Sequence, residues 1–448
     1  MRLLVPASWL IFLFAFTAYG HQTIEPTPSE RQKEWSKMEF YLFMHFGPNT
    51  FTDLEWGKGT EQEEVFNPTE LDCRQWCRIA KAAGASGIII TAKHHDGFCL
   101  WPSKYSTHTV AQSKWKGGKG DVLAELRDAC REYGLRMGVY LSPWDRNHQA
   151  YGTEAYNQVY VEMMEEIVAR YGPFFEFWWD GANGEGPNGK KQVYDFSLFE
   201  KTMRRIGPGT VVFSDIGPDI RWVGNERGIA GKTNWNLLDT AGFFRGAGAP
   251  PTDTLNRGNE NGHNWIPAEC DVSIRPGWFY HEQEDGKVKS PAELFQLYLR
   301  SVGRGSALLL NVPPDQRGLI HGEDSAALMG FKRLREENLG KALEAKGLII
   351  TQSFRLELTS DQTVNCIMIK EILDKGQHCK RFSIRLQNEK QETINEILGT
   401  TIGRERILSF DAVRGVRFIV LSIEEQKALT LISEINAYHI AEGLVEKD

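Results

Sequence analysis

The run Phe174-Phe-Glu-Phe-Trp-Trp-Asp-Gly-Ala-Asn183 decides how the rest of the chain is interpreted. Its apolar positions predict a short buried strand, which Glu176 interrupts and which ends abruptly at Asp180. Helical patterns flank the run on both sides, as is typical of a parallel sheet covered by helices. In barrels of alternating strands and helices, catalytic groups lie at the carboxyl ends of the strands. Asp180 is therefore a candidate catalytic carboxylate, although Asp-Gly is also a common turn pair. The sequence assigns no role to Glu176.

Alternation of strand and helix patterns continues on both sides of this run. The other apolar runs of strand length are 40–45, 87–93, 136–142, 210–214 and 307–311, and the helical patterns are 67–83, 121–133, 156–171, 196–206, 291–302 and 325–338. This order predicts an α/β fold of the TIM type, a (β/α)8-like barrel. Only six strands are evident, so strands six and seven are expected within the irregular region 216–290. A doubly wound sheet is the rival, but no glycine-rich phosphate loop follows the first strand.

The composition changes near residue 345. Tryptophan is absent after Trp278, and short runs with period-two alternation recur between turn signals. This pattern predicts a C-terminal antiparallel β-sandwich over residues 345–448, following a barrel over residues 21–340. Because the sandwich has no aromatic cluster, bracing the barrel is favoured over binding sugar.

The N-terminus has the features of a signal peptide over residues 1–20. Arg2 precedes an apolar stretch that ends in Ala18-Tyr19-Gly20, so cleavage before His21 is expected. We therefore expect a periplasmic or secreted protein. The apolar stretch is short for a transmembrane helix and no other follows, so no membrane span is predicted. The net charge of −7 and the lack of a basic stripe argue against nucleic acid as a partner.

The seven cysteines are an odd number and include no CxxC pair. Most lie in apolar or helical contexts, where a free cysteine behaves as a small hydrophobic residue. The sequence predicts neither a zinc site nor a disulfide framework. It leaves open one bridge, between Cys366 and Cys379.

Acidic residues near strand ends are compatible with cleavage of a glycosidic bond. That reaction needs two carboxyl groups, one a proton donor and the other a nucleophile or a base. Asp180 is the candidate for one role. Glu226, Glu269 and Asp215 are candidates for the other, and spacing does not choose between them. The chain's 11% aromatic residues, many of them near Gly and Pro, suit flat contacts with sugar rings.

Other polar and aromatic residues extend this interpretation. Three histidines at strand ends suit sugar hydroxyls, because a neutral imidazole both donates and accepts. Metal binding would need further ligands at recognisable spacing, and no HxH or HExxH occurs, so no metal site is predicted. Arg275 can bind a sugar or form a surface ion pair, and the aromatic residues can form walls or core. The residues concerned are His45, His94, His95, Trp56, Tyr140, Trp178, Trp278 and Arg275.

Five motifs occur together in one order, and they resemble the α-L-fucosidases of glycoside hydrolase family 29 over roughly residues 35 to 340. They are Met44-His45-Phe46-Gly47, Glu55-Trp56-Gly57, Ala92-Lys-His-His-Asp-Gly-Phe98, Trp178-Trp179-Asp180-Gly181 and Leu310-Asn-Val-Pro-Pro314. The trailing sandwich also fits the family's layout. The resemblance implies a retaining exo-α-L-fucosidase on a distorted (β/α)8-like barrel, with no cofactor. Its substrate would be a fucosylated oligosaccharide or glycoprotein glycan.

By the same resemblance, Asp180 is the nucleophile. The substrate-binding residues would be His45, Glu55, Trp56, His94, His95 and Trp178, with Tyr140 and Arg275 matching less tightly. The segment Arg221–Glu226 is similar to the one that carries the acid/base in the subgroup acting on α-1,3/1,4-linked fucose in branched, Lewis-type glycans. Glu226 is therefore placed ahead of Glu269. The alternatives are a broad-specificity fucosidase that also cleaves α-1,2 linkages, a different retaining glycosidase, and a non-catalytic glycan-binding protein, against which the intact Asp180 and Glu226 argue.

Overall fold

The computed structural model describes residues 23–350 and 353–446, and the predicted signal peptide lies outside them. The chain divides into two compact units. One comprises residues 28–341 together with Glu446, and the other comprises residues 342–445 together with the described residues up to Thr27. In the described ranges, the structure contains no helix with the length and hydropathy needed to cross a bilayer.

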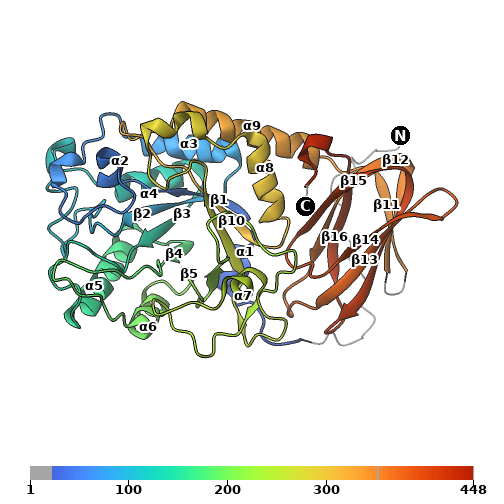
Figure 1. Cartoon of the computed structure of the whole chain (residues 1–448), viewed down its shortest axis with the longest axis horizontal. Helices are drawn as coiled ribbons and strands as arrows, with labels where there is room; N and C mark the ends of the chain where they lie inside the picture. Colours follow the sequence, from blue (N-terminus) through green and yellow to red (C-terminus); the bar gives the residue numbers. More distant parts are fainter. Residues whose placement is uncertain (1–22, 351–352, 447–448) are drawn as a thin grey trace, which may run out of the picture. The chain divides into compact units, whose positions relative to one another are not determined.

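The first unit is a closed barrel of eight parallel strands, in the order β1-β10-β9-β6-β5-β4-β3-β2 (Figure 1). The strands are β1 (Phe40–Met44), β2 (Gly87–Lys93), β3 (Arg136–Leu141), β4 (Glu176–Trp178), β5 (Val211–Ser214), β6 (Ile220–Trp222), β9 (Ala268–Ser273) and β10 (Ala307–Asn311). The predicted TIM-type barrel is confirmed, and its two missing strands, β6 and β9, lie in the irregular region. Neither stands out in the sequence because β6 has only three residues and β9 carries two buried carboxyl groups among its apolar residues.

Helices follow most of the strands. They are α1 (Glu30–Ser36), α2 (Pro48–Thr52), α3 (Cys73–Ala83), α4 (Val122–Tyr133), α5 (Ala155–Tyr171), α6 (Phe196–Ile206), α7 (Thr252–Arg257), α8 (Pro291–Arg300) and α9 (Gly322–Leu339), with 3-10 turns η1 (Glu63–Val65), η2 (Trp115–Gly118) and η3 (Glu282–Lys287). The helix predicted from residue 67 begins only at Cys73, because the Asp72 carboxylate caps it by accepting from Arg74 N at 2.9 Å. A two-residue pair, β7 (Leu237–Leu238) and β8 (Asn264–Trp265), lies within the long loop region.

Side chains two residues apart along a strand point the same way, so each strand adds a column to the barrel interior. The column of β4 is Glu176, Trp178 and then Asp180, just past the end of the strand. The core inside the barrel is mainly aromatic and aliphatic; its members include Tyr41, Phe43, Tyr140, Trp178, Phe213 and Leu309. This packing leaves the polar residues that follow the strands at the carboxyl end of the barrel.

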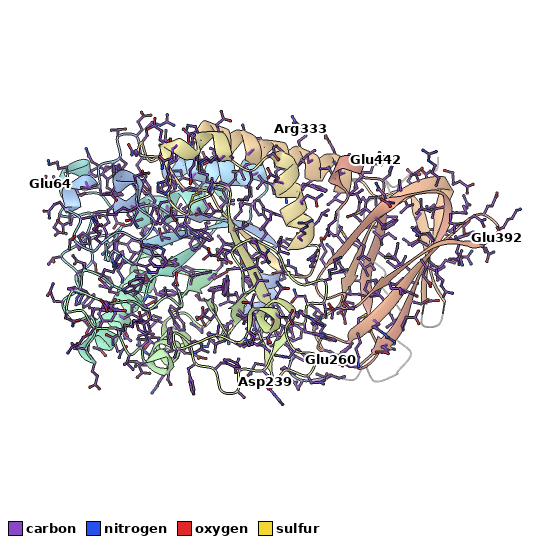
Figure 2. All side chains as sticks on the ribbon, viewed as in Figure 1. Glu64, Asp239, Glu260, Arg333, Glu392 and Glu442 are labelled. Atoms are coloured by element: carbon purple, nitrogen blue, oxygen red, sulfur yellow. The ribbon has the colours of Figure 1, made fainter. Side chains whose placement is uncertain are left out.

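Many charged residues lie on the outside of each unit. Figure 2 shows Glu64 and Arg333 pointing outward from the first unit, and Glu392 from the second. All three side chains are exposed. This distribution follows from the high cost of removing a charge from water.

The second unit is a six-stranded antiparallel sheet in the order β11-β12-β15-β13-β14, with β16 also paired to β12. Its strands are β11 (Ala345–Ile350), β12 (Ser353–Glu371), β13 (Cys379–Gln387), β14 (Thr393–Gly399), β15 (Arg406–Gln426) and β16 (Ile432–Tyr438), followed by η4 (Glu442–Leu444). The predicted antiparallel fold is confirmed. The bridge left open between Cys366 and Cys379 is absent, because β15 lies between their strands and both thiols are free.

Candidate active site

Three histidines lie together at the carboxyl end of the barrel. His45 follows β1, and His94 and His95 follow β2; the His94 ring centroid is 5.5 Å from that of His45 and 4.1 Å from that of His95. Burial lowers the pKa of His45 to about 3 and that of His95 to about 4, and it lowers the pKa of His94 well below the usual value. The three imidazoles are therefore neutral near pH 7.

Two of these rings are fixed by side chains from neighbouring strands. His45 Nδ1 lies 2.8 Å from Asn311 Oδ1, and His95 Nδ1 lies 2.8 Å from Ser142 Oγ. The buried Nδ1 of His94 has no hydrogen-bond partner within the described residues. A buried polar atom without a partner is costly, so this nitrogen is well suited to meet a hydroxyl group of a ligand.

Asp180 is held firmly but remains reachable. Its Oδ2 accepts a hydrogen bond from the Tyr140 hydroxyl at 2.9 Å, and its Oδ1 accepts from Ala182 N at 2.7 Å. The Nε2 atom of His95 lies 3.7 Å from Oδ2, and one quarter of the Asp180 side chain is exposed. These contacts fix the direction of a carboxylate beside three neutral histidines.

A second carboxyl group, Asp215 at the end of β5, lies next to Asp180. A Cβ atom on Gly181 would come within 2.2 Å of Asp215 Oδ2, so the glycine allows this close approach. Burial, together with the neighbouring charge of Asp180, raises the pKa of Asp215 to about 6. Asp215 therefore influences the charge of the site from beside Asp180.

Glu226 lies on the loop after β6 and is exposed. Trp278 links it to the histidines, because the indole Nε1 of Trp278 lies 3.4 Å from Glu226 Oε2 and its ring centroid is 5.1 Å from that of His45. Glu55 supports Trp278 from the other loop: its carboxylate accepts from Trp278 N at 2.9 Å and from Phe279 N at 3.2 Å. Glu226 and Glu55 thus both contact Trp278, one at its indole and the other at its backbone.

Glu269 lies elsewhere, in the barrel interior. Its carboxyl group is completely buried, and its Oε1 accepts from the Trp178 indole at 2.9 Å. Trp178 is itself almost fully buried and stacks on Phe213 with ring centroids 4.0 Å apart. Trp178 is therefore part of the core that supports the site.

The two remaining predicted residues lie in contrasting environments. Trp56 is more than half exposed and meets the His95 ring edge to face, with centroids 6.0 Å apart, so it stands at the edge of the site. Arg275 is fully buried, and its guanidinium pairs with Asp324 at 2.9 Å and with Asp285 at 2.8 Å. Within the described contacts, Arg275 binds these carboxylates and not the group around Asp180.

Several residues of the site were not selected from the sequence. Asn311 donates to the carbonyl oxygen of Trp278 at 2.8 Å while its Oδ1 meets His45, so it joins two parts of the site. Trp144 packs on the His95 ring with centroids 4.8 Å apart and meets Trp56 edge to face. Their positions in the sequence could have pointed to the site, since Asn311 ends one strand and Trp144 follows another.

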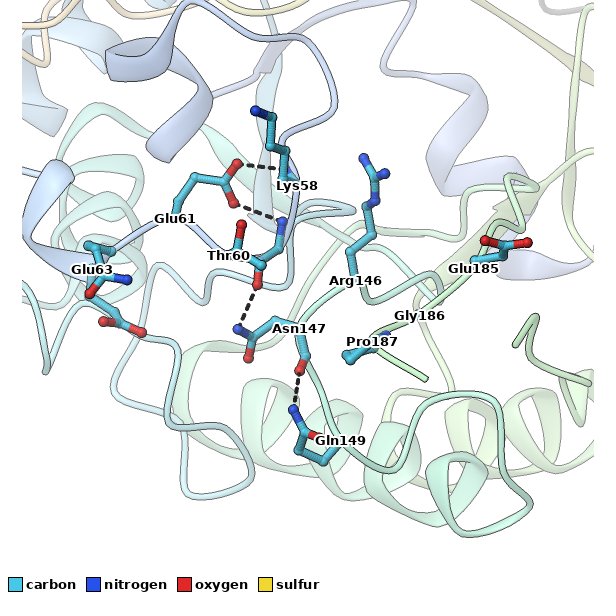
Figure 3. Close-up of a pocket in the computed structure, with 12 residues that line it drawn as sticks. Lys58, Thr60, Glu61, Glu63, Arg146, Asn147, Gln149, Glu185, Gly186 and Pro187 are labelled. Carbon is cyan, nitrogen blue, oxygen red and sulfur yellow. Dashed lines mark hydrogen bonds between the residues drawn. The ribbon is translucent and has the colours of Figure 1, made fainter. Parts of the chain in front are cut away.

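A polar cavity of about 520 Å³ opens beside Arg146 and Asn147 (Figure 3). Its lining comes from three loops and comprises Lys58, Gly59, Thr60, Glu61, Gln62, Glu63, Arg146, Asn147, Gln149, Glu185, Gly186 and Pro187. The loops are tied together, since Asn147 Nδ2 donates to Gly59 O at 2.9 Å. One lining residue, Arg146, connects the cavity wall to the site: its guanidinium lies 5.3 Å from the centroid of the Trp144 ring, and its backbone N–H donates to His95 O at 2.9 Å.

The chain is similar to proteins of one family, both in sequence and in structure. The alpha-L-fucosidase family model matches residues 15–334. Alpha-L-fucosidase 1 of Arabidopsis thaliana is 39% identical over an alignment 450 residues long, which covers 93% of this chain and 88% of that protein. A solved glycoside hydrolase 29 family member from an unknown rumen bacterium superimposes with a TM-score of 0.87 at 39% identity, covering 94% of this chain and 78% of its own. A Ruminococcus gnavus GH29 fucosidase in complex with fucose superimposes with a TM-score of 0.86 at 27% identity, covering 96% and 98%. The chain belongs to the α-L-fucosidases of glycoside hydrolase family 29.

Proposed function

We propose that this fucosidase is a retaining exo-enzyme in which Asp180 is the nucleophile and Glu226 is the acid/base. The observation that carries the proposal is the position of Asp180, which is oriented by Tyr140 and Ala182 N and lies beside three neutral histidines. A fixed carboxylate next to groups that can bind hydroxyls is what attack on a sugar carbon requires.

The reaction would proceed in two displacements. An Asp180 oxygen forms a bond to the anomeric carbon of fucose while the bond to the leaving oxygen breaks, and Glu226 gives that oxygen its proton. Glu226 then removes a proton from water, whose oxygen attacks the anomeric carbon and releases the Asp180 carboxylate. The sugar keeps its anomeric configuration because each displacement inverts it once.

Exposure and packing favour Glu226 over Glu269 as the acid/base. Glu226 is exposed and contacts Trp278, which packs on His45. Glu269 is buried in the barrel interior, where it bonds to Trp178. A group that exchanges protons with the leaving oxygen and with water must be within reach of both.

The same packing suggests roles in binding. His45, His94 and His95 are neutral and can donate to or accept from fucose hydroxyls. Trp56 supplies an exposed aromatic face beside them. Glu55 acts indirectly, since its carboxylate holds the backbone at Trp278.

For linkage, we propose α-1,3/1,4-linked fucose on branched, Lewis-type glycans. The cavity supports a branched substrate, because its lining residue Arg146 is bonded to the backbone of His95 and the lining is rich in groups that bind sugar hydroxyls. Asn147, Gln149 and Glu185 offer amide and carboxylate partners there (Figure 3). A broad-specificity fucosidase that includes α-1,2 linkages is the alternative.

The mechanism is tested by Glu226→Ala assayed with and without azide. We expect a much larger loss on a natural glycan than on an aryl fucoside with a good leaving group, and rescue of the aryl substrate by azide with α-fucosyl azide as product. Azide rescue of Asp180→Gly should instead give the β-azide, because only one displacement remains. If Glu269→Ala shows the acid/base pattern and Glu226→Ala does not, the assignment of Glu226 is overturned.

The linkage is tested by digesting Lewis a, Lewis x and 2′-fucosylated lactose side by side with the wild-type enzyme. The proposal expects rapid cleavage of the two Lewis structures and slow cleavage of the third. Equal rates on all three would establish broad specificity, and cleavage of 2′-fucosylated lactose alone would overturn the linkage proposal.

We also propose that the protein is exported to the periplasm or secreted. The support is the sequence of residues 1–20, with Arg2 before an apolar stretch and small residues before His21. Mass spectrometry of the mature protein should find an N-terminus at His21. Recovery of the uncleaved chain from the cytoplasm of its native host would contradict this.

A further inference from the structure

Two carboxyl groups meet in the middle of the barrel. Glu176 of β4 and Glu269 of β9 are both completely buried, and the hydroxyl of Tyr41 on β1 lies within hydrogen-bond distance of both carboxyl groups. The indole N–H of Trp35, on α1, donates to Glu176 Oε2 at 3.0 Å. Neither acid has a role in the proposed chemistry, and a buried acid pair is too costly to be a packing accident.

The two carboxyl groups are buried without a compensating cation among their described partners. Their described hydrogen-bond partners are neutral N–H and O–H groups, and no Lys or Arg is among them. Burial, with the adjacent Glu269 charge and the hydrogen bond to it, raises the pKa of Glu176 well above its usual value. Glu176 therefore keeps its proton, and burial raises the pKa of Glu269 as well.

Glu269 is bonded to one indole. Its Oε1 accepts from Trp178 Nε1 at 2.9 Å in the barrel interior, where a polar group left without its partner is costly. The bond fixes the plane of the Trp178 ring, which stacks on Tyr140 with centroids 5.3 Å apart and an interplanar angle of 30°. The other end of Tyr140 is its hydroxyl, which donates to Asp180 at 2.9 Å.

We propose that Glu269 is a positioning residue for the nucleophile, acting on Asp180 through the Trp178 indole and the Tyr140 hydroxyl. This rests on the proposed function in one respect, that Asp180 attacks the sugar. No proton moves along the chain of contacts, because Trp178 and Tyr140 meet through their ring faces. Glu269 contributes to the rate by keeping Tyr140 where its hydroxyl fixes the direction of the Asp180 carboxylate.

The proposal is tested by kinetics on an aryl fucoside with Glu269→Leu, Trp178→Phe and the double variant. Loss of the bond to Trp178 should lower kcat about tenfold with KM changed less than threefold, since leaving a buried hydrogen-bonding group unpaired costs about that factor. The decisive readout is non-additivity: in the Trp178→Phe background, Glu269→Leu should lower kcat no further. Full additivity, or an unchanged kcat in a folded Glu269→Leu protein, would overturn the proposal.

A buried tryptophan–glutamate pair outside the barrel interior supplies the matched control. Trp101 Nε1 donates to Glu166 Oε2 at 2.8 Å, and both residues are buried. Glu166→Leu should lower the melting temperature while leaving kcat unchanged, which separates loss of stability from loss of positioning. If Glu269→Leu does not fold, Glu269→Gln replaces it in the cycle, with a severalfold fall in kcat expected in the wild type and none in Trp178→Phe.

Failure of the proposed function would appear differently. Near-normal activity of Asp180→Ala would remove Asp180 as nucleophile whatever Glu269 does. A dead Asp180→Ala together with additive Glu269 and Trp178 variants would keep the proposed function and overturn only the positioning role.

Discussion

The hydroxyl of Tyr140 donates a hydrogen bond of 2.9 Å to Oδ2 of Asp180, from the neighbouring strand of the barrel. Burial, with the charge of Asp180, raises the pKa of Tyr140 well above its usual value, so the hydroxyl keeps its proton and remains a donor. The contact fixes the orientation of the carboxylate and draws charge from one of its oxygens. Tyr140 therefore controls how Asp180 meets a sugar.

Removing this hydroxyl should slow the enzyme without unfolding it. We expect Tyr140→Phe to lower kcat/KM on an aryl fucoside about 10- to 100-fold, the value of one hydrogen bond to a charged group. The matched control is Tyr171→Phe, which deletes a bond of 2.8 Å from a tyrosine to Asp121 on other elements and should leave kcat/KM unchanged. An equal effect of the two variants would show that the Tyr140 bond is only structural.

Asn311 should matter for activity although it is not expected to perform chemistry. Its amide contacts His45 at 2.8 Å and the Trp278 carbonyl oxygen at 2.8 Å, so Asn311→Ala frees both a histidine and a loop. We expect KM for an aryl fucoside to rise several-fold, measured by initial rates. Asn365→Ala, which removes comparable amide bonds in the second unit, should reduce stability alone. A normal KM for Asn311→Ala would mean that the ring of His45 needs no such support.

Gly181 should tolerate no side chain while Asp215 is present. A Cβ at this position would lie 2.2 Å from the Asp215 carboxylate, so Gly181→Ala must displace a group next to Asp180. Activity should fall about tenfold or more, because small displacements of catalytic groups are costly. The loss should be smaller in an Asp215→Ala background, and Gly209→Ala, whose Cβ would meet open space, should have no effect. An equal loss in both backgrounds would exclude the clash as its cause.

The buried histidines should make the protein unstable in acid. In the unfolded chain each histidine takes up a proton below about pH 6.5, whereas the folded pKa is about 3 for His45 and about 4 for His95. The stabilising contribution is therefore fully present above the unfolded pKa of about 6.5 and is lost as the pH falls toward the folded pKa values. At pH 5 the free energy of unfolding should be lower by on the order of 2 kcal/mol per histidine.

The fall in the free energy of unfolding with pH is measured by chemical unfolding at pH 7, 6 and 5. Compared with the wild type, His45→Asn should show a flatter fall in the free energy of unfolding, because it removes one such group. His263→Asn is the control, since that histidine is exposed on the surface and should not change the slope. A slope that is the same in His45→Asn and the wild type would contradict the burial argument.

The sequence by itself determined the class of fold and the position of the nucleophile candidate. Apolar runs alternating with amphipathic helices require a sheet covered by helices, and a carboxylate where a buried strand ends is seldom needed for packing. Asp180 and the three histidines could be found in this way because each lies at the end of a long apolar run. The family resemblance added Glu226, which no spacing rule selects.

Only the tertiary structure decided which polar residues meet. β6 and β9 are hard to detect because three residues, or a strand with two acids, give no clear periodicity. The same reason hides Glu176 and Glu269, which lie 93 positions apart and become partners only when the barrel closes. Burial in that interior, a property of the closed barrel and not of any local segment, is what gives Glu176 its proton and Trp178 its fixed orientation.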